Sequence, residues 1–280
     1  MTVKALKKQL VAAIAMVIVS AIALSSSTYA WFASNNRVMA TGMVVQATAE
    51  GGIEIAYVED SAPGSYSTSA SAGMSSAQVL YPTSTVATAE NDVITSDWYH
   101  ASASVRTSFE ARNGSYTVLS LDADGKEDTT NRYYFIRKKF NVRSVSAAKP
   151  AADLKVSRVE VTGIAQALSK ALRVAIVNGD TKVIYAPVGY TKTASETGFS
   201  YDVATAVNGA GEATMGTQNV TVLYATEVSS VIAATVPAST GDNLNVYVWF
   251  EGEDTNHKSE NLGDTLDSLS LTVHFEANID

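Results

Sequence analysis

The chain has 280 residues, and its 20 Lys and Arg against 28 Asp and Glu give a formal net charge of −8 at pH 7. Nucleic acid and anionic lipid carry the same sign as this acidic surface, so the balance disfavours both as main partners and we expect no nucleic acid. Cysteine is absent, which excludes disulfides and thiolate metal sites. Only 17% of residues are charged, a composition typical of extracellular β structure rich in small and hydroxyl side chains.

The first 30 residues have the three parts of an export signal. Three lysines lie within the first eight residues, and residues 10–24 form an apolar run without charge. That run is shorter than the roughly 18 to 20 residues that span a bilayer as a helix, and it matches the apolar region of a signal peptide. Small and polar residues follow up to Ala30. We therefore predict a signal peptide at 1–30, with signal peptidase as a partner and the cut between Ala30 and Trp31.

An uncleaved membrane anchor is the alternative, with Tyr29, Trp31 and Phe32 as interfacial aromatics. In both cases the chain from Trp31 onward lies outside the cytoplasm, so we expect a secreted, matrix or cell-surface protein, or one anchored in the membrane by its N-terminus. Loss of the leader removes three lysines and leaves 17 basic residues against 28 acidic ones, a net charge of −11.

A period of two in the hydrophobic pattern begins at Val38 and predicts a strand with one apolar face. The residues of this face are Met39, Thr41, Met43, Val45, Ala47 and Ala49. Gly51 and Gly52 follow as a turn, and 53–58 reads as a second strand. We expect these two strands to form a hairpin.

Further strands are predicted where apolar and β-branched residues alternate. The ranges are 115–121, 132–145, 154–161, 173–177, 182–186, 220–224, 243–250 and 269–277, with structure also returning at 97–100. Asn178 and Gly179 give the hairpin signal between two of them. Ile164, Leu168 and Leu172 recur every four residues, which predicts a short amphipathic helix. The polar stretches at about 59–104 and 187–217 read as long loop insertions.

These elements predict an all-β fold, an antiparallel two-sheet sandwich that is jelly-roll-like, with long loop insertions and one short helix. The sandwich domain is assigned to 51–280, and 31–50 is set apart as an N-terminal segment. Two adjacent β domains remain the alternative.

Catalytic motifs are sparse. The three histidines form no HExxH motif, and no GxSxG nucleophile elbow is present. His274 lies in an alternating strand, where a partly exposed residue on one face is expected. We expect no catalytic residue and no enzyme activity.

Two acidic runs are weak candidates for a hard cation such as calcium, and no other cofactor is indicated. The first includes Asp122 and Asp124, and the second Glu251, Glu253 and Asp254. The first run lacks the ligand spacing of an EF-hand. We expect both runs to be exposed, solvated loops instead.

The stretch 28–49, TYAWFASNNRVMATGMVVQATA, resembles the start of the TasA/camelysin group of exported Gram-positive proteins. In that group an aromatic pair at the processed N-terminus is followed by a short polar stretch and then a strand. Here Trp31 and Phe32 take the place of the pair. The closing strands, VYVWFEGED and LSLTVHFEA, are similar to those of related surface proteins.

This resemblance implies a biofilm matrix protein that polymerises into extracellular fibres, in which the N-terminal segment of one subunit completes a sheet of the next by β-strand addition. The partners are then further copies of the chain and an anchoring or nucleating surface protein. The implied interface residues are Trp31, Phe32, Val38, Met39, Met43 and Val45. The alternative is a monomeric surface adhesin or carbohydrate-binding module that uses aromatics such as Trp98, Tyr99 and Trp249.

Overall fold

The computed structural model divides the chain into two compact units, Met1–Asn36 and Arg37–Asp280. It describes residues 16, 38–40, 43–74, 78–85, 89–94, 98–101, 116–127, 132–163, 167–188, 199–207, 212–220, 222–251 and 269–279. Within these ranges no helix is long and apolar enough to cross a membrane. The predicted signal peptide, apart from Met16, and the cleavage site at Ala30 and Trp31 lie outside the described residues, as does Phe32.

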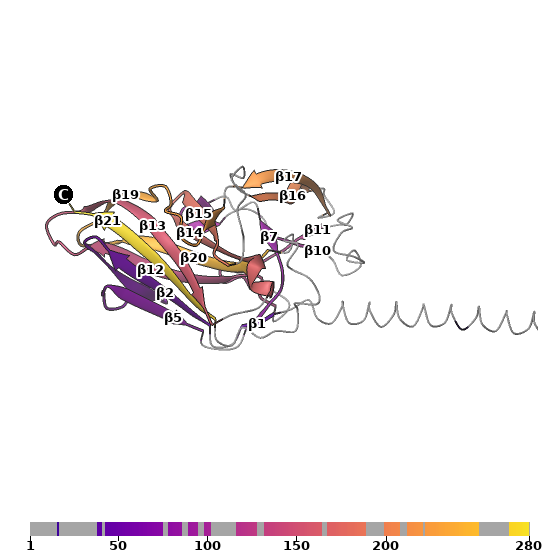
Figure 1. Ribbon diagram of the computed structural model, residues 1–280, viewed down its shortest axis with the longest axis horizontal. Helices are drawn as coiled ribbons and strands as arrows, with labels where there is room; N and C mark the ends of the chain where they lie inside the picture. The colour runs from indigo at the N-terminus through magenta and orange to yellow at the C-terminus, as the bar shows by residue number, and fades with distance from the viewer. Residues whose placement is uncertain are drawn as a thin grey trace, which may run out of the picture. The chain divides into compact units, whose positions relative to one another are not determined.

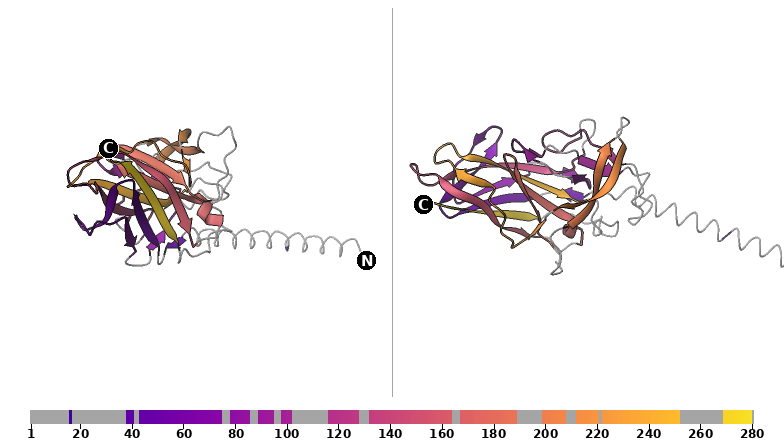
Figure 2. Two further views of the ribbon diagram at one scale, coloured as in Figure 1. Left: turned by 60° about the vertical axis from the view of Figure 1, so that its left-hand side comes forward. Right: turned by 90° about the horizontal axis from the view of Figure 1, so that it is seen from above.

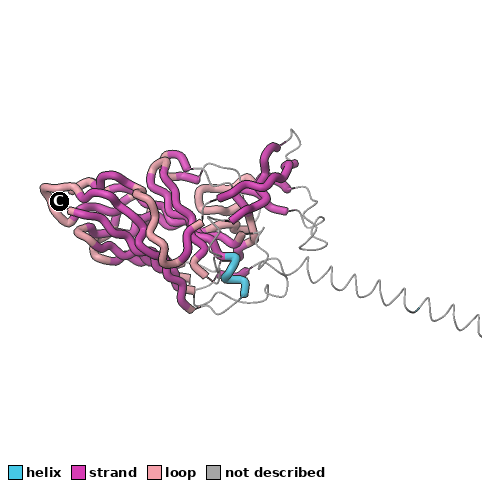
Figure 3. The backbone as a smooth tube through the Cα atoms, turned by 45° about the horizontal axis from the view of Figure 1, so that its top comes forward, coloured by secondary structure: helices cyan, strands magenta, loops and turns pink. Residues whose placement is uncertain are grey.

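Within the described residues, the second unit consists mainly of strands and contains one helical turn (Figure 3). In chain order the elements are β1 Val38–Ala40, β2 Val44–Glu50, β3 Ile53–Glu59, β4 Ala62–Pro63, β5 Ser69–Gly73, β6 Gln78–Leu80, β7 Ser84–Thr85, β8 Ala89–Glu90, β9 Val93–Ile94, β10 Trp98–Ala101, β11 Tyr116–Val118, β12 Ile136–Ser144, β13 Ala151–Thr162, the 3₁₀ turn η1 Ala167–Ala171, β14 Leu172–Asn178, β15 Thr181–Ala186, β16 Phe199–Val207, β17 Glu212–Val220, β18 Leu223–Tyr224, β19 Ala233–Val236, β20 Asp242–Phe250 and β21 Ser270–Asn278.

Two large sheets form most of the described part of the second unit (Figure 1 and Figure 2). One has seven strands in the order β18-β15-β14-β20-β12-β3-β4, and the other has five in the order β19-β13-β21-β2-β5. The predicted all-β sandwich is therefore confirmed. The sheets are mixed rather than purely antiparallel, because β2 runs parallel to β21 and β15 parallel to β18. A further sheet, β16-β17-β11-β10-β7, and the pairs β1-β6 and β8-β9 complete the unit.

The main core lies between the two sheets. On β20, Leu244, Val246 and Val248 point into it, and all three are fully buried. They meet apolar residues of the five-stranded sheet such as Val45 and Phe275. This inward row follows from the period of two in the sequence, since successive side chains of a strand point to opposite faces.

The opposite face of the seven-stranded sheet carries a second core. Tyr247 and Trp249 alternate with the inward row of β20 and are each 1% exposed. Trp98 of β10 lies against Trp249, with ring centroids 5.6 Å apart at 87°, and against Phe135 at 4.5 Å. Strands β9 and β10, which carry Ile94 and Trp98, thus cover part of this face of the sheet.

Two tight turns fasten this covering segment to the sheet. Asn178 and Thr181 pair across the turn between β14 and β15, as the Asn-Gly signal predicted, and Gly179 has the positive φ that such a turn needs. Asp92, in the turn between β8 and β9, donates its backbone N–H to the Gly179 carbonyl at 2.9 Å. In return its carboxylate accepts the Gly179 N–H at 2.5 Å.

The hairpin expected between β2 and β3 is wrong. β2 pairs with β21 and β5, whereas β3 pairs with β12 and β4 in the other sheet. The Gly51-Gly52 turn therefore crosses from one sheet to the other, with positive φ at both residues. A Cβ on Gly51 would lie 2.0 Å from the Ala277 carbonyl oxygen, so this crossing requires glycine.

Two other expectations are also corrected. Of the predicted amphipathic helix, Ile164 lies outside the described residues, Leu168 belongs to the 3₁₀ turn η1, and Leu172 already begins β14, because its side chain joins the core as a strand residue. The predicted loop at 187–217 contains most of the β16-β17 hairpin. The 59–104 insertion holds only short strands, as expected.

Candidate assembly site

The residues implied as an interface fall into three groups. Met43 and Val45 are fully buried in the core of their own subunit, at the start of β2 and within it. Val38 and Met39 form β1, whose backbone pairs with β6. Trp31 and Phe32 lie outside the described residues. The stretch 31–37, which precedes β1 in the sequence, lies outside the described residues.

An acceptor strand needs a sheet edge with unused backbone groups, and β5 is one edge of the five-stranded sheet. Ala49 of β2 donates its N–H to the Thr68 carbonyl at 2.9 Å, so alternate residues of β2 face β5. Ala70 and Ala72 are consequently the residues of β5 that bond to β2. The backbone groups of Ser69, Ser71 and Gly73 face the other way.

The side chain of Lys138 reaches from β12 in the seven-stranded sheet to β5 at the edge of the five-stranded sheet. It belongs to the core-facing row of β12, between Ile136 and Phe140, yet its Nζ donates a hydrogen bond to the Gly73 carbonyl at 3.0 Å. Burial lowers the pKa of Lys138, and the carboxylates of Asp124 and Glu59 partly offset that shift. A lysine in a core row shows that the two sheets are not closed by apolar packing at this end.

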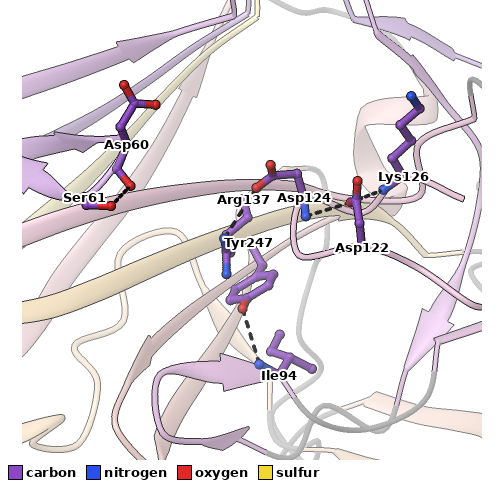
Figure 4. A network of polar contacts seen from close by, with 8 residues as sticks. All are labelled: Asp60, Ser61, Ile94, Asp122, Asp124, Lys126, Arg137 and Tyr247. Atoms are coloured by element: carbon purple, nitrogen blue, oxygen red, sulfur yellow. Dashed lines mark hydrogen bonds and ion pairs between the residues drawn. The ribbon is translucent and has the colours of Figure 1, made fainter. Parts of the chain in front are cut away.

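Three carboxylates lie near Tyr57, close to the C-terminal end of β3. Burial raises the pKa of Tyr57, and Glu59, Asp124 and Asp60 raise it further in that order. Figure 4 shows Asp124 pointing toward Arg137, with which it forms an exposed ion pair at 3.4 Å. Asp124 and Glu59 also act on Lys138, so the charges near the Gly73 carbonyl are of both signs.

The first acidic run is a self-bonded turn. The Asp122 carboxylate accepts the backbone N–H of Asp124 and of Lys126, each at 2.9 Å. Both hydrogen bonds are accepted by the same oxygen, Oδ1 of Asp122. Among the residues that the structure describes, no group of three or more His, Asp or Glu is arranged to hold a metal ion.

The second acidic run is not an exposed loop at its start. Glu251 is fully buried at the end of β20 and accepts a hydrogen bond from the Trp249 indole Nε1 at 3.2 Å. Sequence reasoning missed this because a carboxylate is rarely buried without a partner, and the partner lies two residues earlier on the same strand. Glu253 and Asp254 fall outside the described residues.

The aromatics assigned to a sugar-binding surface are core residues instead. Trp98 is 6% exposed and Trp249 is 1% exposed, and they pack edge to face against each other. Tyr99 is described only by its backbone, which pairs with Val118. The two tryptophans therefore offer no open face for a sugar ring.

His274 is more buried than expected, at 7% exposure, on the outer face of the five-stranded sheet. Its Nδ1 lies 2.8 Å from the Thr48 hydroxyl, and its Nε2 lies 3.5 Å from the Glu160 carboxylate. Glu50 is 3.9 Å from Nδ1. The contacts join β2, β21 and β13, and no sequence pattern predicts them because they depend on the parallel register of β2 and β21.

No family model, no curated protein and no solved structure matches this chain.

Proposed function

We propose that the protein is an exported structural subunit that polymerises outside the cell by donating its processed N-terminal segment to a sheet of the next copy. The proposal extends the resemblance of 28–49 to the TasA/camelysin group. Its activity is then assembly rather than catalysis, and its main partner is a second copy of the chain.

One observation carries this proposal. The second unit begins at Arg37, and its first strand, β1, begins at the next residue, Val38. Residues 31–37 therefore precede a strand directly, and they include two large aromatics, Trp31 and Phe32. A short segment that precedes a strand in the sequence and carries aromatic anchors is suited to β-strand addition, in which main-chain hydrogen bonds give affinity and side-chain pockets give register.

The geometry of such a contact leads to a filament. The donor precedes β1 and the acceptor is a different surface, so the contact is heterologous, and each added copy leaves one donor and one acceptor free. The net charge of −11 after removal of the leader opposes association, since like charges repel. Mildly acidic pH should therefore favour assembly.

The test compares a chain that begins at Trp31 with one that begins at Val38, which retains every strand of the second unit. Both are incubated at high concentration and mildly acidic pH and examined by negative-stain electron microscopy. We expect regular fibres from the longer chain only, with the same thermal unfolding midpoint for both. Fibres of equal length from the chain that begins at Val38 would overturn the proposal.

A further inference from the structure

We infer that the outer edge of β5, Ser69–Gly73, is the acceptor for the 31–37 segment of another copy. This inference rests on the proposed function and names the surface on which the donor strand docks. Among the described strands, β2 alone pairs with β5, so its other edge lies open to a strand of another chain.

Comparison of the described edge strands singles out β5. Proteins usually protect an edge strand with charge, proline, a bulge or short length. β4 and β18 have two residues each, and β4 contains Pro63. β19 has four residues and runs into Pro237. β16 is longer, but it carries Asp202 and an irregular register near Ala204.

β5 has none of these protections. Its sequence is SASAG, its register with β2 is regular, and it contains no charge or proline. The backbone of Ser69, Ser71 and Gly73 faces outward, and a Cβ on Gly73 would meet nothing within 4 Å, so the sheet face at this residue has room for a neighbouring side chain. An incoming strand would find the outward backbone groups of Ser69 and Ser71, whereas the Gly73 carbonyl already accepts the bond from Lys138.

The chemistry of the 31–37 segment matches this edge. Seven extended residues reach roughly 23 Å, enough to cover the roughly 17 Å of a five-residue strand. The small side chains of β5 leave room for Trp31 and Phe32. Arg37 and the new amino terminus are the only charges of the segment, and both are positive. At the Gly73 end of the edge the amine of Lys138 is accompanied by the carboxylates of Asp124 and Glu59, which partly offset the effect of burial on its pKa.

The experiment uses the chain that begins at Trp31 with Ser71→Pro, which removes one outward N–H and none of the bonds to β2. Without this N–H the incoming strand loses one hydrogen bond, and the proline ring hinders its pairing with β5. Fibre elongation from preformed seeds should therefore slow about tenfold or more. Ser71→Lys provides a second variant, because a lysine on an edge strand disfavours pairing. Thr235→Lys is its matched control, the same charge placed at an exposed position of β19.

The expected result is slow elongation for both Ser71 variants and wild-type elongation for Thr235→Lys, with all unfolding midpoints close to that of the parent. Normal elongation of Ser71→Lys, or equal slowing by Thr235→Lys, would overturn the β5 assignment while leaving the fibre proposal intact. If the parent chain forms no fibres at all, the proposed function itself fails. The outcomes therefore separate the two claims.

Discussion

The two main sheets differ in what covers their outer faces. In the seven-stranded sheet every residue of β14 is buried, since the main core lies on one side and the Trp98 cluster on the other. In the five-stranded sheet β2 alternates between buried and half-buried residues, and its outer face carries polar side chains such as Thr48 and Thr272. The first sheet is enclosed, whereas the second presents both a polar face and an open edge, which is where assembly is proposed.

The largest loss of stability is expected from removing a side chain that packs on the covered outer face of the seven-stranded sheet. Trp249→Ala removes the ring that packs against Trp98, and the indole N–H that donates to Glu251. Large-to-small changes of buried aromatics typically cost about 3–5 kcal/mol of unfolding free energy. The measurement is urea unfolding.

Thr272→Ala, on the outer face of β21, is the matched control. It should change the unfolding free energy by less than about 0.5 kcal/mol, as is usual for a surface position. Equal losses from the two variants would show that the two outer faces do not differ in the way described.

A smaller loss of stability is expected from a substitution at Gly51, where the chain crosses from one sheet to the other. Gly51→Ala places a Cβ 2.0 Å from the Ala277 carbonyl at a φ of 72°, so the turn must move. Backbone strain of this kind costs about 1–3 kcal/mol, measured as a lower unfolding midpoint. Gly73→Ala on β5 should cost little, because its Cβ would meet open space. Loss of stability from Gly73→Ala alone would contradict the open edge.

The smallest effect concerns Lys138. Because burial lowers its pKa, the folded protein holds this proton less tightly than the unfolded chain does, and the charged amine costs stability at neutral pH. Lys138→Met should therefore raise the unfolding free energy at pH 7 slightly, because solvent screens the half-exposed amine and the lost hydrogen bond to Gly73 offsets part of the gain.

The cost of the charge disappears as pH rises through the folded pKa toward the value of a free lysine, roughly 10.4. The advantage of Lys138→Met over the parent should therefore shrink between pH 7 and pH 10, as followed by urea unfolding at each pH. A less stable Lys138→Met at pH 7 would mean that the hydrogen bond to Gly73 outweighs the cost of burial.

Most of the long strands were predictable from the sequence, although β16 and β17 were missed, and strand partners were predictable only at the Asn178-Gly179 turn. The alternation of β20 and β21 and the Asn178-Gly179 turn are local signals, and the structure confirms them. The assignment of β2 and β3 to different sheets depends on the close approach of Gly51 to Ala277, more than 200 residues away. A Gly-Gly pair predicts a turn without saying whether the chain stays in the same sheet.

The candidate site was predictable only on the donor side. Trp31 and Phe32 stand out as large aromatics in a small-residue segment, whereas SASAG in β5 carries no signal of its own. Its proposed role as the acceptor rests on its place as the last strand of the five-stranded sheet. The second core was missed for the same reason, because the contact between Trp98 and Trp249 is set by tertiary packing.

The most direct test is amide hydrogen exchange of the chain that begins at Trp31, compared residue by residue between monomer and fibre. Donor-strand addition at β5 predicts strong new protection at Ser69, Ser71 and Gly73. Little change is expected at Ala70 and Ala72, which already bond to β2. Fibres in which the first three amides exchange as fast as in the monomer would contradict the account.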